Sequence, residues 1–128
     1  MIHHFPVTVY YEDTDMGGIV YYANYLKFIE RARSAYVRDL GVDQNAMRDA
    51  GHVFAVRRVE ADYVLPALFD DALVVETTVR AVTGARLIMW QEVLRGTVRL
   101  FQAEVTVVCL TTSGQPARLP LGLRQKLH

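Results

Sequence analysis

The order of the predicted elements constrains the fold most: one strand, one long helix with a wide apolar face, then strands only. Alternating apolar and polar residues predict the first strand over residues 7–12. A helix is expected from about Tyr22 to Leu40, with Gly41 as a permissive stop. Its apolar stripe repeats at three- and four-residue steps and consists of Tyr25, Phe28, Ile29, Ala32, Tyr36 and Leu40. A single helix with such a stripe must be covered by the sheet.

The remainder of the chain predicts a short helix and four strands. Asp43 is expected to cap the short helix, which runs through Ala50 and ends at Gly51. The strands are expected near residues 58–63, 73–80, 86–95 and 98–110, with turns at 83–85 and at Gly96. Close spacing of the last three strands favours antiparallel hairpins over helical crossovers. The expected fold class is α+β, a curved antiparallel sheet around one central helix, in a single domain over residues 1–128.

The charge balance and the apolar content limit the kinds of partner and the cellular location that we expect for this protein. Fourteen basic residues balance fourteen acidic ones, which gives no electrostatic footprint for nucleic acid or an anionic membrane surface. With 52% hydrophobic residues the chain can build a core. It has no apolar run of membrane-spanning length and no secretory signal pattern, so we expect a cytoplasmic protein. An exposed sheet edge and one uncovered sheet face predict a dimer.

Several kinds of catalytic site are disfavoured by the residues present. The two serines, Ser34 and Ser113, do not lie in a Gly-x-Ser-x-Gly elbow, which argues against a serine hydrolase. Cys109 lies in an apolar run and is expected to be a buried small hydrophobe. No glycine-rich phosphate loop is present.

No metal or cofactor is predicted. The acidic turn Asp13–Gly18 weakly resembles a calcium loop, but Asn24 stands where a bidentate glutamate is required. The histidines lack zinc-ligand spacing; they are His3, His4, His52 and His128.

The turn before the long helix is the strongest candidate for chemistry. Asp15 lies seven residues before Tyr22, at the approach to a helix end that offers unpaired N–H groups. Such a place binds an anion or an oxygen that becomes anionic. Gly17 and Gly18 would let the backbone approach a ligand closely. A carboxylate beside an oxyanion site is the minimum equipment for transferring an acyl group to water.

Structural roles compete with these catalytic ones. An aspartate before a helix is commonly a cap or a turn residue, and Asp13, which ends the first strand, fits that role better than Asp15. Glu30 could act as an acid, but we expect it to pair with Arg33 or a nearby arginine.

The segment from Tyr10 to Tyr25, followed by residues 30–33, resembles a known family. Its core is Asp13-Thr14-Asp15-Met16-Gly17-Gly18. This segment is similar to the 4-hydroxybenzoyl-CoA thioesterase-like hotdog proteins. More narrowly, it resembles the YbgC-type acyl-CoA thioesterases associated with the Tol-Pal envelope system. Residues 63–67, 90–93 and 118–120 extend the similarity over nearly the whole chain.

The resemblance implies a hotdog fold and hydrolysis of acyl-CoA thioesters at a dimer interface, often with dimers paired into tetramers. It places the catalytic aspartate at Asp15, as nucleophile or general base, and the oxyanion donor at the backbone N–H of Tyr22. It implies no metal or prosthetic group. An envelope-system or acyl-carrier-protein partner is implied by resemblance only. Many YbgC-type members carry histidine where this chain has Tyr22, so near-neutral titration is lost there.

Two arginines are candidates for binding coenzyme A, and two alternative functions are considered beside hydrolysis. Arg57 and Arg118 are candidate contacts for the phosphates of coenzyme A, although either can be an ordinary surface arginine. A hydratase or dehydratase on the same fold is disfavoured because the long helix contains no histidine. A non-catalytic acyl-CoA-binding or interaction protein of the envelope machinery remains the main alternative.

Overall fold

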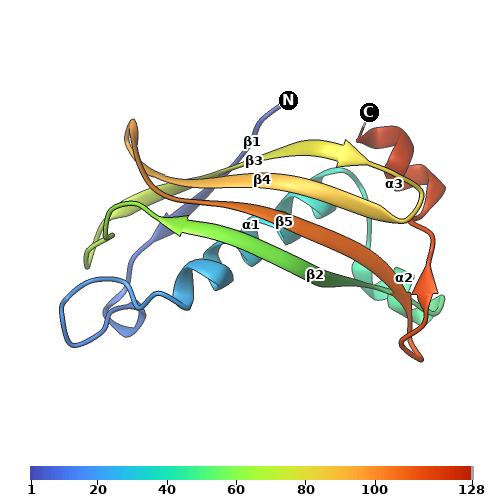
Figure 1. Cartoon of the computed structure of the whole chain (residues 1–128), viewed down its shortest axis with the longest axis horizontal. Helices are drawn as coiled ribbons and strands as arrows, with labels where there is room; N and C mark the ends of the chain where they lie inside the picture. The colour runs from blue at the N-terminus through green and yellow to red at the C-terminus, as the bar shows by residue number, and fades with distance from the viewer. Residues whose placement is uncertain (128) are drawn as a thin grey trace.

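The sheet of the protein curves around one long helix, α1 (Asn24–Asp39), in a computed structural model that describes residues 1–127 (Figure 1). The other elements, in chain order, are β1 (His3–Thr8), the 3₁₀ turn η1 (Tyr11–Asp13), α2 (Gln44–Asp49), β2 (His52–Tyr63), β3 (Ala72–Val82), β4 (Arg86–Arg95), β5 (Val98–Thr111), β6 (Pro116–Ala117) and α3 (Leu121–Lys126). The α+β class and the wrapped helix are confirmed.

The strands pair antiparallel in the order β1-β3-β4-β5-β2, with the short β6 also on β5. Hairpins join β3 to β4 and β4 to β5, as the close spacing predicts. Gly96 forms the second turn at φ 60°, which few residues other than glycine adopt. Strands β1 and β2 are the two edges of the sheet.

The apolar face of α1 packs on the concave face of the sheet. Phe28, Ile29 and Ala32 are almost fully buried, and together with Met89 and Phe101 they belong to one core cluster. Burying a side chain as large as Phe28 contributes about 2–3 kcal/mol. The stripe predicted from the sequence is therefore the face that holds the helix in the sheet.

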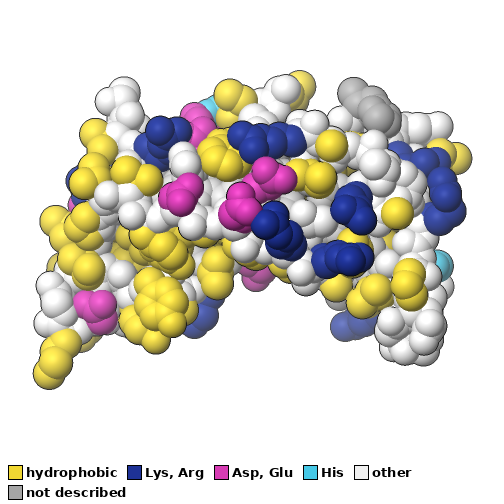
Figure 2. All heavy atoms as spheres, viewed as in Figure 1, with side chains coloured by type: hydrophobic (Ala, Val, Ile, Leu, Met, Phe, Trp, Pro, Cys, Tyr) yellow, Lys and Arg dark blue, Asp and Glu magenta, His cyan; other side chains and the backbone are white. Residues whose placement is uncertain are grey.

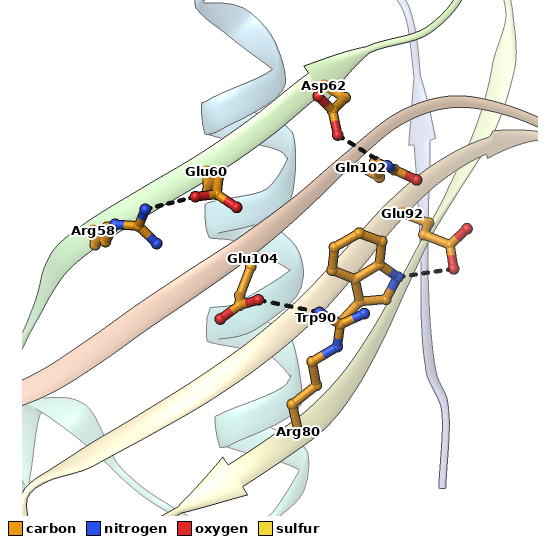
Figure 3. Close-up of polar contacts among 8 residues, drawn as sticks. All are labelled: Arg58, Glu60, Asp62, Arg80, Trp90, Glu92, Gln102 and Glu104. Carbon is orange, nitrogen blue, oxygen red and sulfur yellow. Dashed lines mark hydrogen bonds and ion pairs between the residues drawn. The ribbon is translucent and has the colours of Figure 1, made fainter.

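The outer face of the sheet carries a group of paired polar side chains in its middle (Figure 3). Figure 3 shows side chains from β2, β3, β4 and β5 that pair on the side turned away from α1. Arg80 lies over the Trp90 ring at 4.0 Å from its centroid and donates to Glu104 at 3.1 Å. Glu104 and the other charged side chains of this face remain in contact with solvent, so the pairs contribute little each.

Several predicted boundaries are wrong: the first strand begins at His3 and not at residue 7, β2 begins at His52 and not near residue 58, and β6 and α3 have no counterpart in the expectations. Two boundaries beside the loop differ for one local reason. The first strand ends at Thr8, because the Tyr10 N–H turns back to the Asp13 carboxylate at 2.8 Å and forms η1. The long helix begins at Asn24, two residues later than predicted, with Tyr22 in the preceding turn. The short helix does have Asp43 as its cap, at 2.9 Å from the Asn45 N–H.

Candidate functional site

The loop that contains Asp15 is closed by its own backbone. The Asp15 N–H donates to the Ile19 carbonyl at 2.9 Å, and the Gly18 N–H donates to the Asp15 carbonyl at 3.0 Å. Gly18 has φ 77°, where glycine is favoured. Asp15 Oδ1 accepts the Gly17 N–H at 2.8 Å, and among residues 1–127 nothing bonds Oδ2. Asp15 is exposed, so one carboxylate oxygen braces the turn while the other faces solvent.

The approach to α1 is anchored by Asp13. Its carbonyl accepts from the Tyr21 N–H and from the Asn24 side-chain amide, both at 2.9 Å. Its carboxylate caps η1, which is the structural role that the sequence favoured for Asp13. Within the described chain, the backbone N–H groups of Tyr22 and Ala23 meet no acceptor. Two donors are thus left free directly before the helix.

A groove of about 300 Å³ lies beside these donors. We call it the tyrosine groove; it is lined by Ile19, Val20, Tyr22, Tyr25, Tyr63, Val64, Leu65 and Pro66. Asp15 does not line the groove of the single chain, but it is hydrogen-bonded to Ile19, which does. Figure 2 shows hydrophobic side chains gathered at the end of the molecule where Figure 1 places the loop before α1. An apolar groove beside free amide donors suits a ligand with an apolar body and a carbonyl oxygen.

Two tyrosines tie the groove together. The Tyr63 hydroxyl donates to the Tyr22 carbonyl at 3.0 Å, and the Tyr25 hydroxyl accepts the Ala67 N–H at 3.0 Å. The Tyr25 ring stacks on Phe101 at 5.0 Å. Burial raises the pKa of both Tyr25 and Tyr63, and neighbouring tyrosines contribute at Tyr63. Both hydroxyls therefore stay protonated at neutral pH.

A second cavity, of about 240 Å³, lies further along α1. Its lining residues are Glu30, Arg33, Ser34, Val37, Gln44, Phe54, Ala55, Val56, Leu87, Met89 and Val107. The predicted ion pair of Glu30 with Arg33 is wrong. Glu30 accepts the Ser34 hydroxyl at 2.7 Å, while Arg33 donates to Gln91 at 3.0 Å. Burial lowers the pKa of Arg33 and the charge of Glu30 opposes that effect.

The candidate arginines do not join Asp15 within one chain. Arg57 is exposed at a bulge of β2, between Val56 and Arg58. The Arg118 guanidinium covers Gly84, in the β3–β4 turn, so closely that a Cβ there would clash with it. That turn is at the end of the sheet opposite to Tyr63.

Other residues carry no sign of chemistry. Cys109 is buried, as predicted, and burial raises the pKa of its thiol. Over residues 1–127 no three His, Cys, Asp or Glu side chains gather as metal ligands do, and His128 lies outside the described residues. No helix of the described chain has the length and apolar character needed to cross a membrane.

Sequence reasoning missed the role of Tyr25 and Tyr63 in the groove. The sequence places Tyr25 in the apolar stripe of the helix and Tyr63 in a strand, and both in segments that resemble the family, but it gives neither residue a role in a site. The available signal was the tyrosine content, seven in 128 residues, together with the apolar segment after Tyr63. Their meeting depends on tertiary structure, because residues 25 and 63 are distant in the chain.

Comparison with known proteins gives consistent matches. A family model described as the thioesterase-like superfamily matches residues 9–127. The chain is 41% identical over 126 residues to the acyl-CoA thioesterase YbgC of Haemophilus influenzae, covering 97% of this chain and 93% of that protein. It is also 41% identical over 106 residues to the acyl-CoA thioester hydrolase YbgC of Escherichia coli, covering 82% and 79% of the two chains.

Solved structures agree in fold. A probable thioesterase from Bartonella henselae superposes with a TM-score of 0.89 at 37% identity, covering 94% of this chain and all of that one. A 1,4-dihydroxy-2-naphthoyl-CoA thioesterase from Synechocystis gives a TM-score of 0.90 at 20% identity, covering 99% and 96% of the two chains. The second likeness shows the shared hotdog architecture alone.

Proposed function

This chain belongs to the thioesterase-like superfamily, and from that premise we propose that it hydrolyses acyl-CoA thioesters to a free acid and CoA, with Asp15 as the catalytic carboxylate. The observation that carries the proposal is the presence of two unsatisfied groups, among the described residues, in the segment that leads into α1. One is the free oxygen of the Asp15 carboxylate, and the other is the free N–H of Tyr22. The first can attack or activate water, and the second can stabilise the oxygen that becomes charged.

The acyl group would lie in the tyrosine groove with its carbonyl oxygen toward the Tyr22 N–H. In one route the Asp15 carboxylate attacks the carbonyl carbon, the C–S bond breaks, and its electron pair leaves with the thiolate of CoA. Water then hydrolyses the acyl–aspartyl anhydride. In the other route Asp15 takes a proton from a water that attacks the same carbon. Both routes use the same donor and release the same products.

A tyrosine side chain at position 22 can contribute less to hydrolysis than the histidine found there in many relatives of the YbgC type. A phenol does not titrate near neutral pH as a histidine does, so Tyr22 supplies packing against Tyr63 and no proton transfer there. The backbone N–H is independent of the side chain. We therefore assign the oxyanion role to the backbone and a groove-lining role to the ring.

We infer that the active protein is a homodimer joined along β2. This edge strand exposes Val56 and Val59 at 47% and 38%, and within residues 1–127 its outer edge pairs with no other strand. Antiparallel pairing of two β2 strands would place the His52 end of one protomer beside the Tyr63 end of its partner. Pairing of two such dimers stays a prediction, as does a cytoplasmic location.

The same pairing gives the arginines a role. Arg118 lies at the His52 end of the sheet, so pairing along β2 would bring it toward the groove of the partner. Arg57, at the middle bulge, would lie near the two-fold axis. We propose both as contacts for the phosphates of CoA. Arg118→Glu should raise KM for acyl-CoA several-fold with kcat kept, and an unchanged KM would remove Arg118 from the site.

A thiol-release assay over a panel of short, long and aromatic acyl-CoAs tests the function. We expect stoichiometric release of free CoA with multiple turnovers. The alternative, an acyl-CoA-binding protein without catalysis, is favoured only by the tyrosine at position 22. It would show binding by calorimetry with no thiol released from any member of the panel.

A further inference from the structure

The Tyr63 hydroxyl holds the peptide unit that connects Tyr22 to Ala23. It donates to the Tyr22 carbonyl at 3.0 Å, from a strand 41 residues further along the chain. The preceding peptide unit is held differently, because the Tyr21 carbonyl accepts the Asn24 N–H at 2.8 Å. Tyr22 is thus fixed on both sides, once by local backbone and once by Tyr63.

The Tyr63 ring packs against three aromatic rings on one side and is 48% exposed on the other. It packs edge-on against Phe101 at 5.0 Å, Tyr25 at 5.5 Å and Tyr22 at 6.2 Å between ring centroids. Tyr25 and Phe101 are buried core residues. Tyr63 therefore contacts the core through its ring and the loop through its hydroxyl. Burial and the two neighbouring tyrosines raise the pKa of Tyr63, which keeps its hydroxyl a donor at neutral pH.

A carbonyl and the next N–H belong to one rigid peptide plane, so fixing the carbonyl of residue 22 also fixes the N–H of residue 23. Among residues 1–127 the N–H groups of Tyr22 and Ala23 have no acceptor. Donors stabilise a developing oxyanion only when their direction is set before the reaction. A free carbonyl at Tyr22 would let this plane rotate and spread the direction of the Ala23 N–H, while the Tyr22 N–H belongs to the preceding plane.

We propose that Tyr63 is a positioning residue, which orients the Ala23 N–H, a second donor beside that of Tyr22, through its hydrogen bond to the Tyr22 carbonyl. The proposal rests on the proposed thioester hydrolysis and adds to it a residue outside the loop. Tyr63 does not contact the reacting atoms in this role. Its ring lines the tyrosine groove, and its hydroxyl acts on the backbone.

The test is Tyr63→Phe, which removes the hydroxyl and keeps the ring. We expect kcat to fall about tenfold, a part of the 10²–10³ that removal of a whole oxyanion donor costs, while KM stays within about twofold because the ring still lines the groove. The amide ¹⁵N resonance of Ala23 should also move, since that nitrogen shares its peptide with the released carbonyl. Circular dichroism and thermal unfolding establish that the variant is folded.

Tyr21→Phe is the matched control. Tyr21 packs on Tyr22 at 5.0 Å, but its hydroxyl donates to no residue within 1–127 and it does not line the groove. Its kinetics should equal those of the wild type. The proposal is overturned if Tyr63→Phe keeps kcat within twofold, if it changes KM alone, or if Tyr21→Phe loses as much.

Failure of the proposed function has a different outcome. A wild-type protein that releases no thiol, or an Asp15→Asn variant with full turnover, contradicts the hydrolytic site itself. Full turnover of Tyr63→Phe beside an inactive Asp15→Asn contradicts only the positioning role.

Discussion

The side-chain amide of Gln91 donates to the Ile29 carbonyl at 2.9 Å, and so joins strand β4 to the middle of α1 inside the core. The same nitrogen donates to the Thr77 hydroxyl at 3.0 Å, and the Gln91 oxygen accepts from Arg33 at 3.0 Å. Gln91 and Thr77 are fully buried. This network fixes how far α1 can slide along the sheet, and with it the position of the loop before the helix.

Replacing Gln91 by methionine keeps the volume and removes every hydrogen bond of the network. We expect a loss of about 2–4 kcal/mol in the free energy of unfolding, because the Arg33 guanidinium loses its acceptor in a half-buried place. Urea denaturation measures it. Gln102→Met on the neighbouring strand is the control; its partner Asp62 is exposed, and its cost should stay below about 0.5 kcal/mol.

The glycine at position 18 is required for its backbone angle and not for space. Its φ is 77°, and a Cβ there would meet no atom within 4 Å. Gly18→Ala should therefore cost about 1–2 kcal/mol from backbone strain alone, and Gly18→Asn clearly less, since asparagine tolerates this region.

Gly122→Ala is the matched control for Gly18→Ala. Gly122 lies in α3 with ordinary helical angles and open space, so alanine there should be neutral or stabilising. Thermal unfolding of the variants checks both values. Equal costs at positions 18 and 122 would show that the loop does not impose the positive φ.

Protonation of Asp71 is expected to lower the free energy of unfolding at acid pH. Partial burial opposes its ionisation, but the Leu68 N–H and Arg95 together outweigh that effect and hold the pKa of the carboxyl below its usual range. A lowered folded-state pKa means that the unfolded chain binds the proton first as pH falls. The contribution is present above the ordinary carboxyl pKa, near 4, and is lost as pH drops through the folded value.

Asp71→Asn should therefore flatten the pH dependence at its acid end. Between about pH 5 and pH 3, the urea midpoint of the wild type should fall more steeply than that of the variant. Asp70→Asn, at an exposed neighbour, should keep the wild-type slope. Parallel curves for Asp71→Asn and the wild type would mean that the bonds to Leu68 and Arg95 leave the pKa unchanged.

Local patterns predicted the type and order of the main elements, because their determinants lie within a few residues, but not the start of β2 at His52 or the presence of α3. The stripe of α1 and the Asp43 cap follow from spacing alone. At the start of α1, the Asn24 side-chain amide donates to the Asp13 carbonyl. Arg33 does not pair with Glu30 because it donates instead to Gln91 of β4. Contacts of this range are not visible in periodicity.

The candidate site was predictable in part. The acidic turn before a helix and the family resemblance predict Asp15 and Tyr22 as site residues, and both assignments stay predictions. The groove was not predicted, because Tyr22 and Tyr25 meet Tyr63 and Val64 only in the folded chain. The separation of Arg118 from Asp15 within one chain was also not foreseen, since it depends on which end of the folded sheet each residue occupies.

The central claim is that the free carboxylate oxygen of Asp15 performs the chemistry, and turnover of Asp15→Asn tests it most directly. Asparagine can still accept the Gly17 N–H, so the loop and the assembly should stay intact. Asp13→Asn is the control, since the described contact of the Asp13 carboxylate is the Tyr10 N–H at η1 and the backbone carbonyl of residue 13 is kept. The account predicts that thiol release from acyl-CoA falls at least 10³-fold in Asp15→Asn, an order expected for loss of a catalytic group, and stays near wild type in Asp13→Asn. Turnover by folded Asp15→Asn within a few-fold of wild type would contradict it.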